Sequence, residues 1–253
     1  MQLMMLGVGS SAGTPVIGCQ CQTCRSNNPK NKRLRCSAAI MTDQGDVILI
    51  DTGPDLRAQS LRAELTRADA VLYTHTHADH LHGIDDLRAF CQIQKKQIPL
   101  YGKSDAMQHI QDKFGYAIRP AGDFWDLPVL SLNPITGPFE LFGLTITPIP
   151  VKHGYSDILG YRIGNMAYLT DVSDIPASSM SLLKNLDILM LDCLRYTPHY
   201  THINVEQSLA FAGKINALDT YLIHMTHDID YDKLSTELPD HIHVAFDGLK
   251  LNF

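Results

Sequence analysis

The densest group of residues that could bind metal ions lies in segment 74–83, which reads THTHADHLHG and follows an apolar run. Side chains two residues apart point the same way in an extended chain, so His75 and His77 can bind one metal ion from the end of a strand. Asp79 and His80, where the chain should turn into a helix, can reach a second ion beside it. Imidazole combined with carboxylate suits Zn²⁺, Mn²⁺ or Fe²⁺ better than Ca²⁺. The spacing therefore predicts a divalent metal site, and the competing interpretation is a solvated polar loop.

Three further residues of the same types, His153, Asp171 and His224, each follow an apolar run. A single histidine or aspartate at a strand end is usually structural. Together the three repeat one pattern, in which a strand delivers a ligand type at its end, and this is how a rigid scaffold builds a site. Asp51 shares the pattern and can instead orient a ligand histidine through a hydrogen bond. His82 lies in the motif but exceeds the ligand count, and three other histidines are expected on surfaces or edges: His109, His241 and His243.

A second cluster places Cys19, Cys21 and Cys24 within six residues, which is too crowded for three separate disulfides. Structural zinc needs four closed ligands, and three cysteines with one histidine are a common set. The expected fourth ligand is His227, three residues beyond His224. A redox pair or buried thiols are the alternatives, but clustered cysteines of this kind favour one structural Zn²⁺.

The elements that must position these residues are short apolar strands that alternate with helices. Apolar runs predict strands at 3–8, 38–42, 47–50, 70–73, 99–101, 144–149, 160–163, 166–169, 188–191, 220–223 and 244–246. Helical periodicity predicts helices at 55–66, 84–91, 105–114, 179–183, 205–215 and 230–238. Short links at residue 45 and at 164–165 indicate antiparallel hairpins. The fold class is therefore α/β, in one domain spanning residues 1–253, with helices covering the sheets.

Composition narrows the functional classes. Of the 253 residues 45% are hydrophobic and 19% are charged, and 21 basic against 27 acidic residues give a net charge of −6. A protein that coats nucleic acid would be basic, so we expect no stable nucleic-acid complex, and an anionic substrate must be attracted locally. No stretch approaches the roughly 18 apolar residues of a membrane span, and no basic region precedes the short apolar run at the start. We therefore expect a cytoplasmic protein without a membrane partner.

The ligand pattern resembles that of the metallo-β-lactamase-fold hydrolases. The matching features are His-x-His-x-Asp-His at 75–80, Ile-Asp-Thr-Gly at 50–53 and the later single His, Asp and His. The resemblance covers nearly the whole chain and implies an αββα sandwich, in which two mixed β-sheets are flanked by helices. It also implies two catalytic divalent metal ions, Mn²⁺ or Zn²⁺. One ion would be held by His75, His77 and His153, the other by Asp79, His80 and His224, and Asp171 would bridge the two.

The cysteine motif narrows the resemblance to one branch. Cys-x-Cys-x-x-Cys near the N-terminus, with a late His-x-x-His, is similar to the PhnP family of cyclic-phosphate phosphodiesterases, which serve the carbon–phosphorus lyase pathway. This resemblance implies a structural zinc loop at about 18–36 and a homodimer. It implies a small anionic phosphodiester as substrate, 5-phosphoribosyl 1,2-cyclic phosphate. Hydrolysis would give ribose 1,5-bisphosphate during phosphonate catabolism.

Breaking a phosphodiester also requires a proton for the leaving oxygen, and histidine is the natural donor near neutral pH. His199 and His202 lie in the loop that precedes the helix predicted at 205–215. In the PhnP family the acid histidine comes just before a helix start that carries asparagine, which His202-Ile203-Asn204 matches better than His199. We expect His202, as the proton donor, and Asp79, beside the second ion, to act in catalysis. His199 stays open as the alternative donor.

Other functions also stay open. A 2′,3′-cyclic-nucleotide phosphodiesterase, or another small-nucleotide phosphodiesterase, would use the same metal motif. A tRNA 3′-processing enzyme usually carries an extra arm, for which segment 154–170 is too short and has a single basic residue, Arg162. Lactamase-type or thioester hydrolysis explains neither His202 nor the cysteines. A non-catalytic partner protein of pyrroloquinoline-quinone biosynthesis has the same fold and similar cysteines, but the intact ligand set disfavours it.

Overall fold

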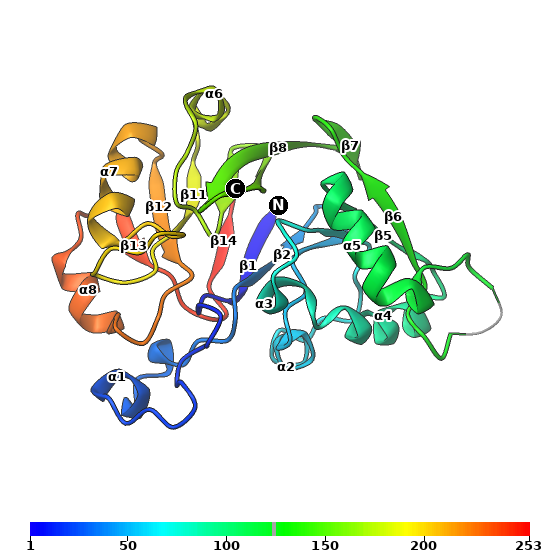
Figure 1. The fold of residues 1–253 in the computed structure, drawn as a ribbon, viewed down its shortest axis with the longest axis horizontal. Helices are drawn as coiled ribbons and strands as arrows, with labels where there is room; N and C mark the ends of the chain where they lie inside the picture. Colours follow the sequence, from blue (N-terminus) through cyan, green and yellow to red (C-terminus); the bar gives the residue numbers. More distant parts are fainter. Residues whose placement is uncertain (123–124) are drawn as a thin grey trace.

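Two β-sheets lie face to face, with helices on both outer faces, in the computed structural model, which describes residues 1–122 and 125–253 (Figure 1). This αββα sandwich confirms the α/β class predicted from the strand and helix pattern, and it is the architecture that the family resemblance implied. The first sheet has the order β14-β1-β2-β3-β4-β5-β6. Its strands are β1 (Gln2–Gly7), β2 (Ser37–Met41), β3 (Val47–Ile50), β4 (Ala70–Leu72), β5 (Ile98–Gly102), β6 (Leu130–Pro134) and β14 (Lys250–Asn252).

The second sheet has the order β13-β12-β11-β10-β9-β8-β7. Its strands are β7 (Phe139–Leu141), β8 (Leu144–His153), β9 (Ser156–Ile163), β10 (Met166–Leu169), β11 (Ile188–Asp192), β12 (Asp219–Ile223) and β13 (Ile242–Val244). Both sheets are mixed, because β3 to β6 and β10 to β13 pair in parallel whereas the other neighbours are antiparallel. The hairpins predicted at residue 45 and at 164–165 are confirmed as antiparallel pairs.

The strands are apolar on both sides because both sides are covered. In β1, Leu3 and Met5 belong to the core between the two sheets, whereas Met4 and Leu6 belong to the core under the helices. This double burial explains the continuous apolar runs in the sequence. It also fixes the register of each strand, since a slip of one residue would exchange the two faces.

Helices cover each sheet from its outer side. The first sheet packs against α2 (Leu56–Arg62), α4 (Leu87–Gln94) and α5 (Ser104–Phe114), and the second against α6 (Ala177–Met180), α7 (Val205–Ile215) and α8 (Tyr231–Glu237). The short α3 (Ala78–Leu81) follows β4. Single turns of 3₁₀ helix lie at Pro29–Asn31, Ile84–Asp86, Gly115–Ala117 and Ser181–Leu183. Helix α7 starts as predicted, because the Asn204 side chain and Gln207 form a reciprocal cap.

Two kinds of element differ from the prediction. The strands β6, β7 and β14 were not predicted, because all three are edge strands with a partly exposed, polar-interrupted sequence. The strand predicted at 244–246 is present but lies two residues earlier, since β13 spans Ile242–Val244. Beyond it the Asp247 carboxylate accepts hydrogen bonds from the backbone of Val8 and Leu34, which requires a turn rather than a strand.

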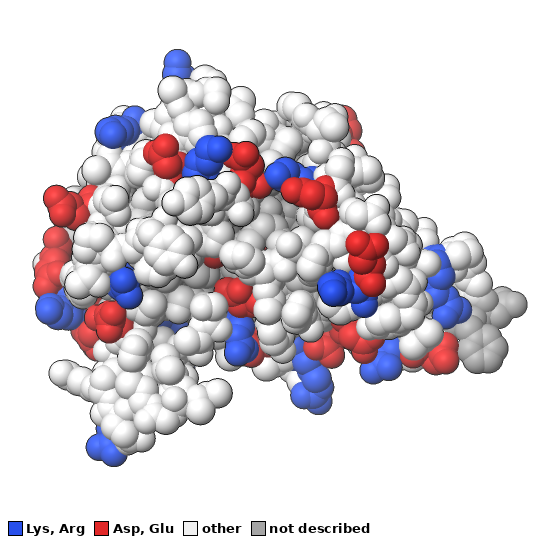
Figure 2. Space-filling view, viewed as in Figure 1, with Lys and Arg blue, Asp and Glu red and all other residues white. Residues whose placement is uncertain are grey.

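The cysteine-containing segment 18–36 includes α1 (Gln22–Arg25) and extends from the body of the molecule beneath α8 (Figure 1). Acidic and basic side chains alternate around the face drawn in Figure 2, and neither sign forms a continuous patch on that face. Within the described ranges, no helix combines the length and the apolar character needed to cross a bilayer.

Candidate metal centre

The strand ends of the two sheets meet at one edge of the sandwich. Segment 74–80 follows β4 in the first sheet, whereas Asp171 follows β10 and His224 follows β12 in the second. His153 is the last residue of β8. Because parallel strands place their carboxyl ends at the same edge of a sheet, side chains from distant parts of the chain converge there.

Three of these strand-end residues have a left-handed backbone. The φ angles are 61° at Asp51, 57° at Asp171 and 60° at His224. Aspartate and histidine are among the few residues other than glycine that adopt this conformation with any frequency. The chain therefore reverses direction directly at the residue that carries the functional group.

All seven predicted metal ligands lie together. One group, within which the potential ligand atoms are at most 4.8 Å apart, contains His75, His77, His153 and Asp171. A second group with the same limit contains Asp79, His80, Asp171 and His224. Asp171 belongs to both groups, which is the position required of a residue that bridges two ions.

The donor atoms fit divalent cations. The Nε2 atoms of His75, His80 and His224 are buried and lack a hydrogen-bond partner among the described residues. Leaving a buried polar atom unpaired is costly, so three such atoms in one place indicate a missing partner. The Asp171 Oδ1 atom lies 3.1 Å from Nε2 of His80 and 3.2 Å from Nε2 of His224, without the alignment of a hydrogen bond. Imidazole nitrogens that face carboxylate oxygens in this way form a suitable cage for Zn²⁺ or Mn²⁺.

Electrostatics within the cluster support the same assignment. Burial alone would raise the pKa of Asp171, yet the charges of His224 and His80 hold it well below the usual range. Burial alone would lower the pKa of His80, but Asp171 and Asp51 hold it well above its ordinary value. Burial and the charge of His80 keep the pKa of His75 well below its ordinary value. The carboxylates thus favour positive charge at this place, which a bound divalent cation would supply.

Asp51 orients one of the predicted ligands, His80, through a hydrogen bond. Its Oδ2 atom accepts a hydrogen bond of 2.7 Å from Nδ1 of His80, and its two oxygens accept from the backbone and the hydroxyl of Thr74. Bonding Nδ1 leaves Nε2 of His80 directed at the cluster. The sequence pattern allowed this role, and the hydrogen bond confirms it.

His202 lies beside the cluster, with Nε2 3.8 Å from Asp171 Oδ2. Its ring centroid is 4.8 Å from that of His153 and 4.9 Å from that of His224. His199 is farther out, since its ring stands 5.5 Å from His202 and its Nδ1 atom bonds to Thr201. The geometry therefore favours His202 over His199 as the residue that reaches a group bound at the centre.

Sequence reasoning missed Asp192, the last residue of β11, which is fully buried. Its Oδ2 atom accepts a hydrogen bond of 3.2 Å from Nδ1 of His202, and its Oδ1 atom lies 3.5 Å from Nδ1 of His224. This carboxylate therefore orients the His202 ring through a hydrogen bond, and it lies beside the His224 ring without bonding to it. The signal was present, because Asp192 ends an apolar strand as Asp171 does, but nothing in the sequence connects it to His202.

The cysteines form a separate group with His227. The Nδ1 atom of His227 lies 3.2 Å from the sulfur of Cys19 and 3.5 Å from those of Cys21 and Cys24. A hydrogen bond from the Cys24 backbone lowers the pKa of Cys21 to about 6 against the opposing effect of burial, and this favours the thiolate that zinc requires. The four residues fit a closed structural zinc site. The three remaining cysteines are buried elsewhere: Cys36, Cys91 and Cys193.

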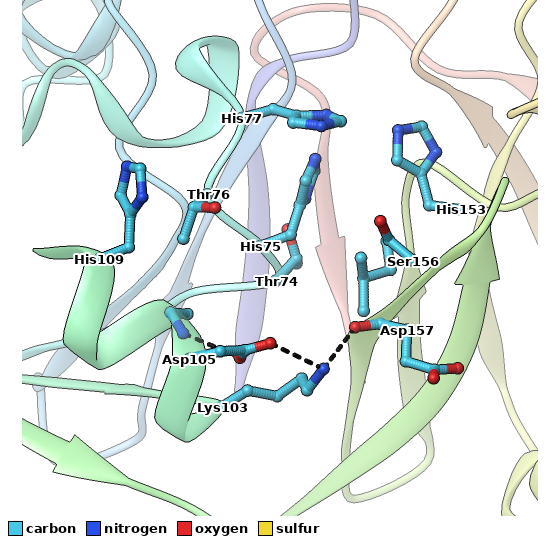
Figure 3. A pocket seen from close by; sticks show the side chains of 12 residues that line it. Thr74, His75, Thr76, His77, Lys103, Asp105, His109, His153, Ser156 and Asp157 are labelled. Carbon is cyan, nitrogen blue, oxygen red and sulfur yellow. Dashed lines mark hydrogen bonds and ion pairs between the residues drawn. The ribbon is translucent and has the colours of Figure 1, made fainter.

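A cavity of about 190 Å³ opens beside His75, His77 and His153 (Figure 3). Figure 3 shows Lys103 at its base, where the ammonium group bonds to Asp105 and to the backbone oxygen of Asp157. His109, on α5, also lines this cavity. His109 is half-exposed, which agrees with the expected surface position, but the sequence did not indicate that this surface borders the site.

Comparison with known proteins agrees with this geometry. Residues 47–225 match the Beta-lactamase superfamily domain. The crystal structure of a new diphosphatase from the PhnP family superimposes with a TM-score of 0.93 at 42% identity, over 100% of this chain and 97% of that one. Zn²⁺-bound PqqB from Methylobacterium extorquens superimposes with a TM-score of 0.82 over the full length of both chains, but at 20% identity it shows the shared fold alone.

A curated relative has a different name. The octanoyltransferase of Porphyromonas gingivalis is 39% identical over 254 aligned residues, which are 99% of this chain and 51% of that protein. This chain therefore spans about half the length of that relative.

Proposed function

Because this chain belongs to the β-lactamase superfamily and has the metallo-β-lactamase fold, we propose that it is a hydrolase that opens a small cyclic phosphodiester. The fold implies divalent metal cofactors, and the two ligand groups that share Asp171 suit a pair of ions. The proposed substrate is 5-phosphoribosyl 1,2-cyclic phosphate, with ribose 1,5-bisphosphate as the product. The 42% identity to a structure named as a diphosphatase of the PhnP family supports a hydrolase of that family that acts on a phosphorus ester or anhydride.

The observation that carries the proposal is the position of His202. Its Nε2 atom lies 3.8 Å from Asp171, the residue shared by both ligand groups, while its Nδ1 atom is held by Asp192. A proton donor fixed beside a two-cation site is what the cleavage of a poor leaving group needs. A non-catalytic binding protein would need no such donor.

The chemistry divides between the cations and the chain. When bound, the divalent ions would supply an activated water and neutralise the phosphate oxygens. The imidazoles and carboxylates of the two ligand groups would fix the ions, and Asp51 would hold the His80 ring in its orientation through the hydrogen bond to Nδ1. As water adds to phosphorus, the bond from phosphorus to the oxygen on carbon 2 breaks, and that oxygen takes the proton on Nε2 of His202. The proton that the water loses restores His202.

A second candidate substrate is a 2′,3′-cyclic nucleotide, which two exposed tyrosines favour. Tyr155 is fully exposed and Tyr200 is 79% exposed, on neighbouring turns beside His153. The turns touch, since a Cβ atom at Gly154 would lie 2.9 Å from the side chain of Thr201. Exposed aromatic rings beside a phosphate site can stack on a base.

A panel of substrates separates these functions. The metal-loaded protein should hydrolyse 5-phosphoribosyl 1,2-cyclic phosphate with the highest kcat/KM, ahead of 2′,3′-cyclic AMP, bis(nitrophenyl) phosphate and inorganic diphosphate, and should leave an aliphatic thioester intact. Higher kcat/KM for the cyclic nucleotide would favour the second candidate. Absence of turnover on every phosphorus ester, in protein with full metal content, would refute the proposed function.

A further inference from the structure

A second cavity, of about 310 Å³, shares no lining residue with the cavity in Figure 3. Three loops form its walls, at residues 10–12, 194–202 and 226–228. His202 lines this second cavity, whereas His75, His77 and His153 line the first. The cavity thus begins at the proton donor.

The position of the proton donor decides where the body of a substrate lies. In the proposed reaction the oxygen that receives the proton stays attached to the sugar. The sugar must therefore lie on the side of His202, and any group beyond the sugar extends into the second cavity. This step rests on the proposed function.

The lining of the second cavity offers donors that nothing in the chain uses. Ser10 is buried, with 3% of its surface exposed, and its hydroxyl makes no hydrogen bond within residues 1–122 and 125–253. The amide and the hydroxyl of Ser11 also make none within those ranges, but Ser11 is exposed and its backbone oxygen is held by Arg35. The Ser10 hydroxyl is therefore the buried donor that is available to an acceptor oxygen of a ligand, and the Ser11 donors lie beside it on a fixed loop.

The charge of the lining suits an anion. Arg195 is the one basic side chain of lysine or arginine type in the described lining of this cavity. Its Nε atom and one terminal nitrogen donate hydrogen bonds to the backbone oxygens of Thr197 and Pro198. The other terminal nitrogen has no partner in the described part of the chain. His199 and His227 add imidazoles, and Asp228 is the one carboxylate, 3.9 Å from Nε2 of His227. In the first cavity, by contrast, the Lys103 ammonium already bonds to Asp105.

We propose that the second cavity is a subsite for a phosphate monoester group on the substrate, held by Arg195, Ser10, Ser11 and His199. Arginine matches the geometry of phosphate oxygens, and hydroxyl and amide donors satisfy the oxygens that remain. For a phosphoribosyl substrate this group is the phosphate on carbon 5. The subsite would make the protein selective for phosphorylated sugars over the bare sugar ester.

The test compares two ligands that differ only in this phosphate, ribose 1,5-bisphosphate and ribose 1-phosphate, by calorimetry on the metal-loaded protein. The wild type should bind the bisphosphate about tenfold to a hundredfold more tightly, as expected for charge-assisted hydrogen bonds. Arg195→Gln and Ser10→Ala, on separate loops, should each lose most of this preference and bind ribose 1-phosphate as the wild type does. Lys103→Gln, which removes a cation from the first cavity, should keep the preference.

The outcomes separate the subsite from the proposed function. No preference in the wild type, an unchanged preference in both Arg195→Gln and Ser10→Ala, or loss of the preference in Lys103→Gln would each overturn the subsite. A preference that depends on Arg195 supports the subsite even if no cyclic ribosyl phosphate is turned over, and in that case the proposed substrate alone fails.

Discussion

Removal of the His202 imidazole tests the proposed mechanism most directly. General acid catalysis contributes about 10²–10⁴ in rate when the donor is well positioned. In this structure the hydrogen bond of 3.2 Å from Nδ1 to Asp192 fixes the ring, and Nε2 lies 3.8 Å from Asp171 at the centre. We therefore expect His202→Ala to lower turnover of an alkyl cyclic phosphate at least about a hundredfold, or about 2.7 kcal/mol of transition-state stabilisation.

The informative comparison uses leaving groups of different quality. A nitrophenolate leaves without a proton, so His202→Ala should change the hydrolysis of a nitrophenyl phosphodiester by less than about threefold. His202→Asn provides the matched control, because its amide can still donate to Asp192 but has no second nitrogen to act as the acid. It should reproduce the loss on the alkyl ester while restoring the partner of the buried carboxylate.

Initial rates on both esters, the metal content and the melting temperature complete the assay. Equal losses on both esters, with metal content unchanged, would refute the role of His202 as acid and would assign it to phosphate binding. His199→Ala would then be the next variant to measure.

Three further predictions follow from the site and its surroundings. Cys21→Ser should lower the melting temperature and the zinc content, because structural zinc is coupled to folding; a variant that melts like the wild type with unchanged zinc would contradict the closed site. Asp171→Ala should reduce both catalytic ions in elemental analysis, since Asp171 belongs to both ligand groups, and two ions still bound per chain would argue against the bridge. Burial raises the pKa of Cys36 and of Cys193 to about 12, whereas the unfolded thiols ionise near 8.5. These thiols lose protons only on unfolding, so their contribution to stability is fully present below about pH 8.5 and falls above it, by about 2 kcal/mol per thiol at pH 10. In urea unfolding, the double variant Cys36→Ala, Cys193→Ala should therefore lose less stability between pH 8.5 and 10 than the wild type. An unchanged dependence of stability on pH would count against this origin.

The sequence predicted the parts of the site that are local in the chain. Segment 74–83 carries four of the predicted ligands within six residues. The strand-end pattern added Asp171 and His224, because apolar strands with both faces covered are easy to recognise in a sequence. Helix α7 was predicted to the residue, since its cap is a short-range interaction between Asn204 and Gln207.

What the sequence did not reveal depends on contacts between distant segments. Asp192 meets His202 ten residues away, through a loop whose path is set by tertiary packing. The second cavity lies where the backbone at Gly9 pairs with Arg35 and Met225, and no local sequence pattern predicts this pairing of distant segments. His109 joined the first cavity because of where α5 starts, a placement that helical periodicity does not specify.

The left-handed backbone at Asp51, Asp171 and His224 has a consequence for protein engineering. The residue types that bind divalent metals and those that tolerate this conformation overlap in aspartate and histidine, and the three strand ends use that overlap. The same side chains grafted onto strands that continue in ordinary extended conformation would leave the scaffold along different directions and would not converge. The unit that can be transplanted is therefore a strand together with its left-handed terminal residue and the first residues of the loop. A library that varies only the identity of the ligand residues would leave the backbone conformation, which sets their direction, unchanged.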